Sequence, residues 1–235
     1  MKTSFYSLDG HEHKEKLEAL SDIIIDEVRK VPKELFFPWH EAKIHNGKWF
    51  LCPLKLFEVE YPTAKSILPN TLRILNEMPT IQAGISILKS GAVIYPHSDV
   101  EAGEDGKLYP TTGKIAEGGS FLSAISSISN RGDVLISRDS YRMHLGITIP
   151  ENCELSVMNE DGEYDNATWE EGKVLSFDDS QMHKAYNLSD EDRVVLIVDV
   201  PKENVKITKQ QKDDIMKHAM RFYGKGEEGY KDLLK

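Results

Sequence analysis

From residue 81 to residue 200 the sequence is a succession of short segments rich in Val and Ile, with no helical segment between them. Glycine, proline, asparagine or aspartate separates these segments, which is typical of short β-strands joined by turns. Many short strands without intervening helices favour an antiparallel barrel or a double-sheet jelly roll over a parallel α/β sheet. The expected strands cover residues 81–88, 143–149, 153–158, 173–177 and 193–200.

Helical segments are expected on either side of this β region. Residues 49–51 are expected to be extended, and a short helix is expected to begin at Pro69 and to end before Pro79. After Pro201 a last helix is expected, with Ile215, Ala219, Phe222 and Tyr223 on one face. One amphipathic helix is expected over residues 14–30, because apolar residues recur there at helical spacing: Leu17, Leu20, Ile23, Ile24 and Val28.

The 235 residues are expected to form one mainly β domain. In this division, residues 1–80 are a helical and extended cover, residues 81–200 are the β core, and residues 201–235 contain the C-terminal helix. The interval 100–138 interrupts the core, is rich in Gly, Ser and Thr, and is longer than an ordinary loop. The interpretations that stay open for it are a lid that orders over a substrate, a disordered surface insertion, or an extra hairpin that extends the sheet.

The composition narrows the class of protein. Hydrophobic residues make up 40% and charged residues 29% of the chain, as in a soluble globular protein. The formal net charge of -10 argues against a nucleic-acid partner. No apolar run approaches the roughly 18 residues of a membrane span, and the polar N-terminus is unlike a secretory signal. Cys52 and Cys153 are isolated, so a reducing, cytoplasmic location is expected rather than a disulfide.

The segment around His97 and Asp99 carries the most informative chemistry. In an extended chain these two residues point to the same side, so an imidazole and a carboxylate can share one metal ion. His183 supplies a second imidazole later in the chain. Two histidines and one carboxylate leave positions open on the metal and suit non-haem Fe(II), whereas a structural zinc site would need four protein ligands. A His-x-Asp pair taken alone is weak evidence, because most histidines in β proteins are structural.

Arg193 opens the apolar strand that follows His183. An arginine that points into a barrel is costly unless it meets an anion, and its planar fork fits a carboxylate such as that of 2-oxoglutarate. The alternative is a solvent-exposed arginine paired with Glu191 or Asp192. Arg142 and His144 alternate onto one strand face, which is either a pair of donors on a barrel wall or a polar outer surface.

Taken together and in order, these segments resemble the aspartyl/asparaginyl β-hydroxylase family. The resemblance covers about residues 40–201 and rests on an ordered set of motifs: residues 49–54 (WFLCPL), 85–88 (ISIL), 91–97 (GAVIYPH), 142–146 (RMHLG), 169–173 (WEEGK), 177–180 (FDDS) and 193–200 (RVVLIVDV).

The resemblance implies a double-stranded β-helix, related to the jelly roll and the cupins, that uses Fe(II), 2-oxoglutarate and O₂ to hydroxylate an unactivated carbon. It implies His97 and His183 as metal ligands, and Arg193 with Ser86 as the contacts of the 2-oxoglutarate carboxylate. Arg142 and His144 match family residues that contact carboxylates of the cosubstrate or the substrate.

This chain departs from the animal members of the family in its metal ligands and its length. They have glycine where this chain has Asp99, so a complete triad is expected here. Their helical repeat region and membrane anchor are not in this sequence, so a stand-alone, bacterial-type enzyme is expected. The expected substrate is an aspartyl or asparaginyl residue of a peptide, or an amino-acid-like small molecule.

Two other functions stay open at this point. A cupin-like metalloenzyme would use the same triad without 2-oxoglutarate, and a binding or sensing module would hold a structural metal or none. Turnover of 2-oxoglutarate separates the first from the hydroxylase. Metal analysis with O₂ consumption separates the second.

Overall fold

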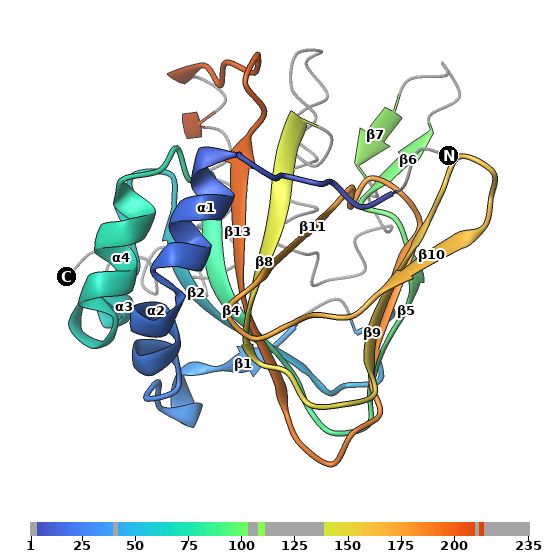
Figure 1. Cartoon of the computed structure of the whole chain (residues 1–235), viewed down its shortest axis with the longest axis horizontal. Helices are drawn as coiled ribbons and strands as arrows, with labels where there is room; N and C mark the ends of the chain where they lie inside the picture. The colour runs from blue at the N-terminus through green and yellow to red at the C-terminus, as the bar shows by residue number, and fades with distance from the viewer. Residues whose placement is uncertain (1–3, 40–41, 103–107, 111–138, 210–211, 214–235) are drawn as a thin grey trace.

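The computed structural model describes residues 4–39, 42–102, 108–110, 139–209 and 212–213 (Figure 1). In this part β-strands hold more residues than helices do, and every strand pair within its sheets is antiparallel. The prediction of a mainly β, double-sheet fold of the double-stranded β-helix type is therefore confirmed. The five strands expected from the sequence are all present, with ends that differ from the expected ones by at most a few residues.

The larger sheet has seven strands. Along it the order is β1-β2-β4-β13-β8-β11, and β3 pairs with β2 off this path. The strands are β1 (Phe37–Pro38), β2 (Trp49–Leu56), β3 (Val59–Glu60), β4 (Gln82–Leu88), β8 (Ser140–Thr148), β11 (Val174–Phe177) and β13 (Arg193–Pro201).

The smaller sheet has four strands in the order β10-β9-β12-β5. They are β10 (Tyr164–Ala167), β9 (Cys153–Met158), β12 (His183–Asn187) and β5 (Ala92–His97). A separate two-stranded sheet, β6 (Val100–Ala102) with β7 (Leu108–Pro110), follows β5.

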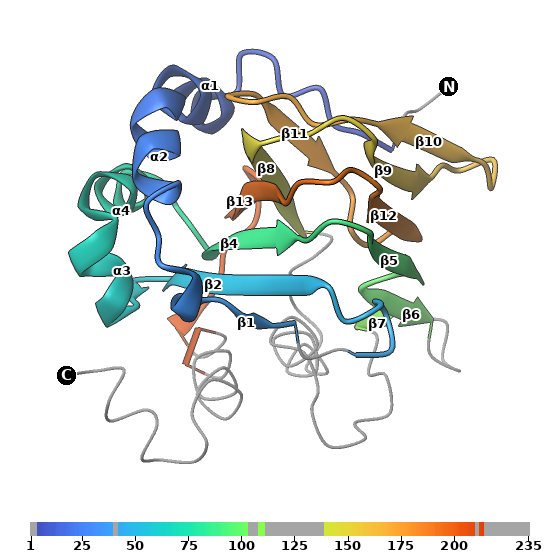
Figure 2. The ribbon, with the colours of Figure 1, turned by 90° about the horizontal axis from the view of Figure 1, so that it is seen from below.

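The larger sheet lies between the helices on one side and the smaller sheet on the other, as Figure 2 shows. Each face of its strands therefore belongs to a different core, as the alternation of β13 demonstrates. Leu196 and Val198 pack into the core that the helices cover. Val195 and Ile197 pack into the core between the two sheets. Arg193 and Asp199 have the same parity as Val195, so the alternation turns both polar residues toward the space between the sheets.

The N-terminal helical segment differs from the prediction of a single helix over residues 14–30. The structure has two helices, α1 (Glu12–Ala19) and α2 (Ser21–Val28), separated by Leu20 with φ -108° and ψ 13°. The break lets α1 contact β8 and β11 while α2 contacts β8 and α4. Two short helices can follow the twisted surface of the sheet better than one straight helix can, which explains why helical periodicity alone predicted the wrong length.

The second helical segment also contains two helices. The helix predicted after Pro69 is present as α4 (Pro69–Asn76), and α3 (Pro62–Ile67) precedes it. Both begin with proline at the first turn, where its missing N–H costs nothing. A short 3₁₀ helix, η1 (Lys33–Leu35), follows α2.

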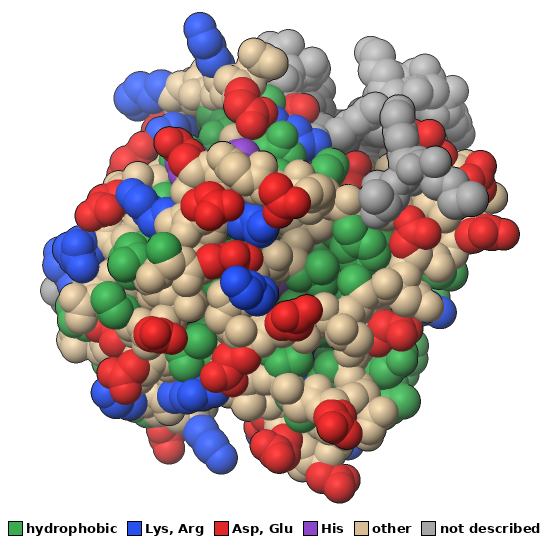
Figure 3. Space-filling model, viewed as in Figure 1, with side chains coloured by type: hydrophobic (Ala, Val, Ile, Leu, Met, Phe, Trp, Pro, Cys, Tyr) green, Lys and Arg blue, Asp and Glu red, His purple; other side chains and the backbone are tan. Residues whose placement is uncertain are grey.

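Some predictions concern segments outside the described residues. The expected C-terminal helix, with Ile215 and Phe222, lies there, as does most of the interval 100–138. Within the described part, Cys52 and Cys153 are both free, buried thiols, and none of the helices is long and apolar enough to cross a membrane. On the face drawn in Figure 3, acidic and basic side chains are interspersed.

Candidate metal centre and anion pocket

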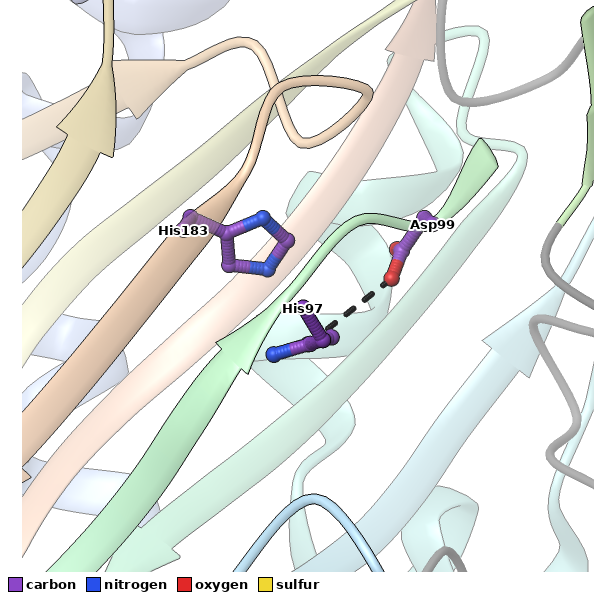
Figure 4. Close-up of side chains that lie close together, drawn as sticks. All are labelled: His97, Asp99 and His183. Carbon is purple, nitrogen blue, oxygen red and sulfur yellow. Dashed lines mark ion pairs between the residues drawn. The ribbon is translucent and has the colours of Figure 1, made fainter. Parts of the chain in front are cut away.

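The smaller sheet brings His97, Asp99 and His183 together. His97 ends β5 and His183 begins the neighbouring strand β12, where the two residues are direct partners across the strands. Asp99 follows two residues after His97, and Figure 4 shows its carboxylate turned toward the two imidazoles. The two rings are 4.2 Å apart between centroids, and His97 Nε2 lies 3.9 Å from Asp99 Oδ1. One ligand atom from each residue lies within 4.8 Å of the others.

Both imidazoles are oriented by their own backbone. His97 Nδ1 lies 2.8 Å from the carbonyl oxygen of Tyr95, and His183 Nδ1 lies 2.9 Å from that of Gln181. A carbonyl only accepts, so each Nδ1 carries the proton and donates it. The Nε2 lone pair of each ring is then free for a metal, which is the usual arrangement of metal-binding histidines.

The protonation states of the three groups suit a divalent cation. Burial lowers the pKa of His183 to about 4, so its ring is neutral at pH 7. Burial opposes ionisation of Asp99, but the charge of Arg142 and the polar neighbours His183, His97 and Asp179 outweigh it and lower the pKa of its carboxyl. The donors are therefore two imidazoles and one carboxylate, and this set fits non-haem Fe(II).

A cavity of about 910 Å³, counted with its open mouth, connects the three residues to the space between the sheets. All seven residues that the sequence predicted as ligands or cosubstrate contacts line it: Ser86, His97, Asp99, Arg142, His144, His183 and Arg193. The rest of its wall is largely apolar and aromatic: Trp39, Trp49, Leu51, Ile94, Leu155, Trp169, Phe177 and Ile197 among others.

Arg193 is a buried cation that lacks a carboxylate partner among the described residues. Its side chain is 2% exposed, which excludes the alternative of an exposed pair with Glu191 or Asp192. Its guanidinium lies over the Trp169 ring at 4.7 Å, while its Nε and Nη1 have no hydrogen-bond partner in the part of the chain that the structure describes. Burial lowers the pKa of Arg193 to about 9. Buried donors without partners are costly, so an anion in this cavity would stabilise them.

His144 offers a second buried donor. Trp169 Nε1 lies 3.2 Å from His144 Nδ1, and an indole N–H can only donate. Burial, with the charges of Arg193 and Arg142, lowers the pKa of His144 well below its usual value, so the ring is neutral. A neutral ring whose Nδ1 accepts a hydrogen bond carries its proton on Nε2. That Nε2 is buried and has no partner in the described part of the chain.

Ser86, like His144, accepts a hydrogen bond from a tryptophan and keeps its own proton for another partner. Its Oγ accepts a hydrogen bond from Trp49 Nε1 at 3.0 Å. The hydroxyl proton of Ser86 therefore stays available for donation to another group. Ser86 and Arg193 both lie on the larger sheet, on the neighbouring strands β4 and β13, so the serine hydroxyl and the arginine face one cavity.

Arg142 differs from Arg193 because its donors are already occupied. Its Nε and Nη2 bind the two oxygens of Asp199 at 3.0 and 2.9 Å. Its Nη1 contacts Asp99 Oδ2 at 3.2 Å and Asp179 Oδ2 at 2.8 Å. The alternative of a polar outer face for Arg142 and His144 is excluded, since both side chains are buried.

Asp179 and Asp199 are functional-site residues that were not predicted from the sequence. Asp199 could have been predicted from the sequence. It is a carboxylate within an apolar strand and has the same parity as Arg193, so both side chains must point to the same side of the strand. Asp179 could not have been predicted, since Asp178 and Asp179 are equivalent in sequence and only the structure shows which one is buried.

The family model for aspartyl/asparaginyl beta-hydroxylase matches residues 18–203. The chain belongs to the aspartyl/asparaginyl beta-hydroxylase family. The human aspartyl/asparaginyl beta-hydroxylase is 44% identical over 175 residues, which cover 72% of this chain and 18% of the human protein. An ornithine lipid ester-linked acyl 2-hydroxylase of Rhizobium tropici is 43% identical over 61 residues, covering 26% of this chain and 21% of that protein.

The chain thus spans less than two thirds of either relative. Among solved structures, a prolyl-4-hydroxylase of Pseudomonas putida is similar with a TM-score of 0.43 and 12% sequence identity, over 86% of this chain and 91% of that one.

Proposed function

We propose that this member of the β-hydroxylase family is an Fe(II)- and 2-oxoglutarate-dependent hydroxylase. In the overall reaction one C–H bond of the substrate, 2-oxoglutarate and O₂ are converted to an alcohol, succinate and CO₂. The observation that carries the proposal is the combination, in one cavity, of the His97/Asp99/His183 set with donors of Arg193 and His144 that have no partner among the described residues.

The metal would be held by His97 Nε2, His183 Nε2 and a carboxylate oxygen of Asp99. When bound, Fe(II) with three open positions supplies the oxidising chemistry that side chains lack. The protein supplies the geometry: both histidines present Nε2 because their Nδ1 protons are donated to Tyr95 and Gln181. No side chain is needed as a general base for this reaction.

The distal carboxylate of 2-oxoglutarate would bind at Arg193, with Ser86 as a second donor. Arginine can bind a carboxylate through two parallel hydrogen bonds, and the Nε and Nη1 of Arg193 are the atoms that lack partners within the described ranges. His144 Nε2–H would donate to an oxygen of the cosubstrate or the substrate. A cupin-like enzyme without 2-oxoglutarate would leave these buried donors unexplained.

The aromatic and aliphatic wall would exclude water around the reacting carbon. Trp39 and Trp49 stack at 4.3 Å between centroids, with 13° between their planes, and both line the cavity. A dry site protects a reactive oxidant from side reactions. The proposed substrate is an aspartyl or asparaginyl residue or an amino-acid-like small molecule, which the family membership supports.

The deciding experiment loads the protein anaerobically with Fe(II), adds 2-oxoglutarate and O₂, and measures succinate. Slow succinate formation without substrate, accelerated by a true substrate, is the expected result. Candidate peptides and small molecules are then analysed by mass spectrometry for the gain of one oxygen atom. Protein that binds Fe(II) but neither binds nor decarboxylates 2-oxoglutarate would instead support the cupin-like alternative.

A further inference from the structure

Arg142 lies at the centre of a buried cluster of three aspartates. Its bidentate pair with Asp199 occupies Nε and Nη2, and its Nη1 is shared between Asp99 and Asp179. Every nitrogen of the guanidinium therefore contacts a carboxylate. This cluster joins the two sheets, because Arg142 and Asp199 lie on β8 and β13 of the larger sheet while Asp99 follows β5 of the smaller one.

Asp199 takes part in this cluster without reaching the cavity. It is 1% exposed and is not among the cavity-lining residues, whereas Arg142 and Asp99 are. Asp199 and Arg142 are direct partners across β13 and β8, so the sheet itself sets their separation. Gln82 also donates a hydrogen bond to Asp199 Oδ2. Asp199 is thus a fixed anion that can influence the metal centre only through its contact with Arg142.

The geometry at Asp99 shows what this arrangement achieves. Arg142 Nη1 contacts Oδ2 of Asp99, while Oδ1 is the atom that faces His97 Nε2. A carboxylate held by one oxygen cannot rotate freely about its Cβ–Cγ bond. The other oxygen is therefore presented toward the two imidazoles as a single ligand atom, and partners of this kind tune metal affinity.

We propose that Asp199 is a positioning residue that aims the Asp99 carboxylate at the metal by fixing Arg142. The inference rests on the proposed metal centre and assigns Arg142 a role other than the contact to a cosubstrate or substrate carboxylate that the family resemblance implies.

The test is a double-mutant cycle in which Co(II) binding to the whole chain is measured for each variant. Titration gives the Co(II) affinity, and the visible absorption spectrum of bound Co(II) reports its coordination. The proteins are the parent, Asp199→Asn, Asp99→Gly and the double variant. In the parent background Asp199→Asn should weaken Co(II) binding about 10- to 100-fold and change the spectrum. In the Asp99→Gly background it should weaken binding by less than about twofold, because the carboxylate that it positions is gone.

Two outcomes overturn the proposal. One is Asp199→Asn with the Co(II) affinity and spectrum of the parent. The other is an equal loss in both backgrounds, which is the result of a general structural defect. Asp192→Asn is the matched control, since Asp192 directly precedes the same strand and its carboxylate accepts a hydrogen bond from the backbone N–H of Ser90, outside the cluster. Its Co(II) affinity should equal that of the parent.

A second variant covers the case in which Asp199→Asn does not fold because Arg142 loses its pair. Replacing both members of the bidentate pair, as in Arg142→Met with Asp199→Leu, avoids leaving either of these two partners alone, and folded proteins often tolerate such an exchange of a buried ion pair. This variant should also lose Co(II) affinity, because Asp99 loses the donor that orients it. Parental affinity in this folded variant would refute the positioning role.

The same data separate this inference from the proposed function. If the parent binds no Co(II), or if Asp99→Gly binds it as the parent does, the metal centre itself is wrong and both proposals fail. If Asp99→Gly weakens binding and Asp199→Asn does not, only the positioning role of Asp199 fails.

Discussion

Trp169 contacts both of the buried donors that face the cavity: its Nε1–H donates to His144 Nδ1 at 3.2 Å, and its ring lies 4.7 Å from the Arg193 guanidinium. The first contact places the His144 proton on Nε2, and the second gives a desolvated cation a favourable neighbour. Trp169 therefore sets the tautomer of His144 and stabilises the Arg193 cation, and both of these groups would bind the same anion.

Trp169→Phe separates these two contacts. Phenylalanine keeps an aromatic face beneath Arg193 but has no N–H, so His144 can adopt either tautomer. The Michaelis constant for 2-oxoglutarate should rise about fivefold, the equivalent of one hydrogen bond of about 1 kcal/mol. Steady-state kinetics provide the measurement, with Fe(II) affinity as the control that should not change. A parental Michaelis constant would show that the tautomer of His144 is irrelevant to cosubstrate binding.

The metal ligands make separate contributions that substitution can resolve. His97→Ala and His183→Ala should each abolish Fe(II)-dependent turnover while the circular dichroism spectrum stays that of the parent. Asp99→Gly removes the carboxylate ligand and leaves both imidazoles, so we expect weaker Fe(II) binding with part of the activity retained. Metal titration and turnover assays test all three variants, and unchanged Fe(II) affinity throughout would refute the site.

Arg193 and Ser86 should differ in their effect on the cosubstrate. Arg193→Lys keeps the charge and loses the planar fork, so the Michaelis constant for 2-oxoglutarate should rise about tenfold or more. Ser86→Ala removes one hydrogen bond of about 1 kcal/mol and should raise it less. Metal content should stay constant in both. Arg193→Lys kinetics that match the parent would exclude this arginine as the carboxylate contact.

Gly146 is required by a close approach of two backbone segments. A Cβ at this position would lie 2.1 Å from the Glu170 carbonyl oxygen, and this contact holds the segment next to Trp169 against β8. Gly146→Ala should lower the free energy of unfolding by about 1–3 kcal/mol through overpacking. At Gly84 the nearest atom would be a flexible Leu51 methyl at 3.1 Å, so Gly84→Ala should cost less. Urea denaturation measures the free energy of unfolding of both variants. Equal losses for Gly146→Ala and Gly84→Ala would contradict a special requirement for glycine at position 146.

Glu27 on α2 caps a different helix, α4. Its carboxylate accepts hydrogen bonds from the backbone N–H of Asn70 and Thr71 and from both of their side chains. Burial opposes ionisation of Glu27, but these hydrogen bonds outweigh it and lower its pKa below the ordinary 4.5. Glu27→Gln should therefore destabilise the protein at pH 7 by about 1 kcal/mol, as the loss of a helix cap does.

The pH dependence of this effect has a definite sign. Because the folded-state pKa is the lower one, the contribution of the Glu27 charge is fully present above its ordinary pKa of 4.5. It is lost as the pH falls through the lowered value. Thermal unfolding at several pH values should show the gap between parent and Glu27→Gln closing in acid. Glu34→Gln, at an exposed position, should match the parent at every pH.

Strand periodicity predicted much of the site, because successive side chains of a β-strand point to opposite faces and every second residue therefore shares a face. His97 with Asp99, and Arg142 with His144, were predicted in this way to act on one side of a strand. The same rule applied to β13 would have predicted that Asp199 points with Arg193, since both are in phase with the buried Val195.

The sequence by itself determined the β architecture, the spacing of His97 and Asp99, and the arginine that opens an apolar strand. These are local properties, set by backbone geometry within a few residues. Only the tertiary structure decided that, within the described residues, Arg193 meets no carboxylate while Arg142 meets three. Both are arginines on apolar strands, and the difference arises from which side chains other strands bring within about 3 Å, a long-range outcome of strand register. For the same reason, the break at Leu20 followed from the shape of the sheet on which α1 and α2 pack and not from helical periodicity.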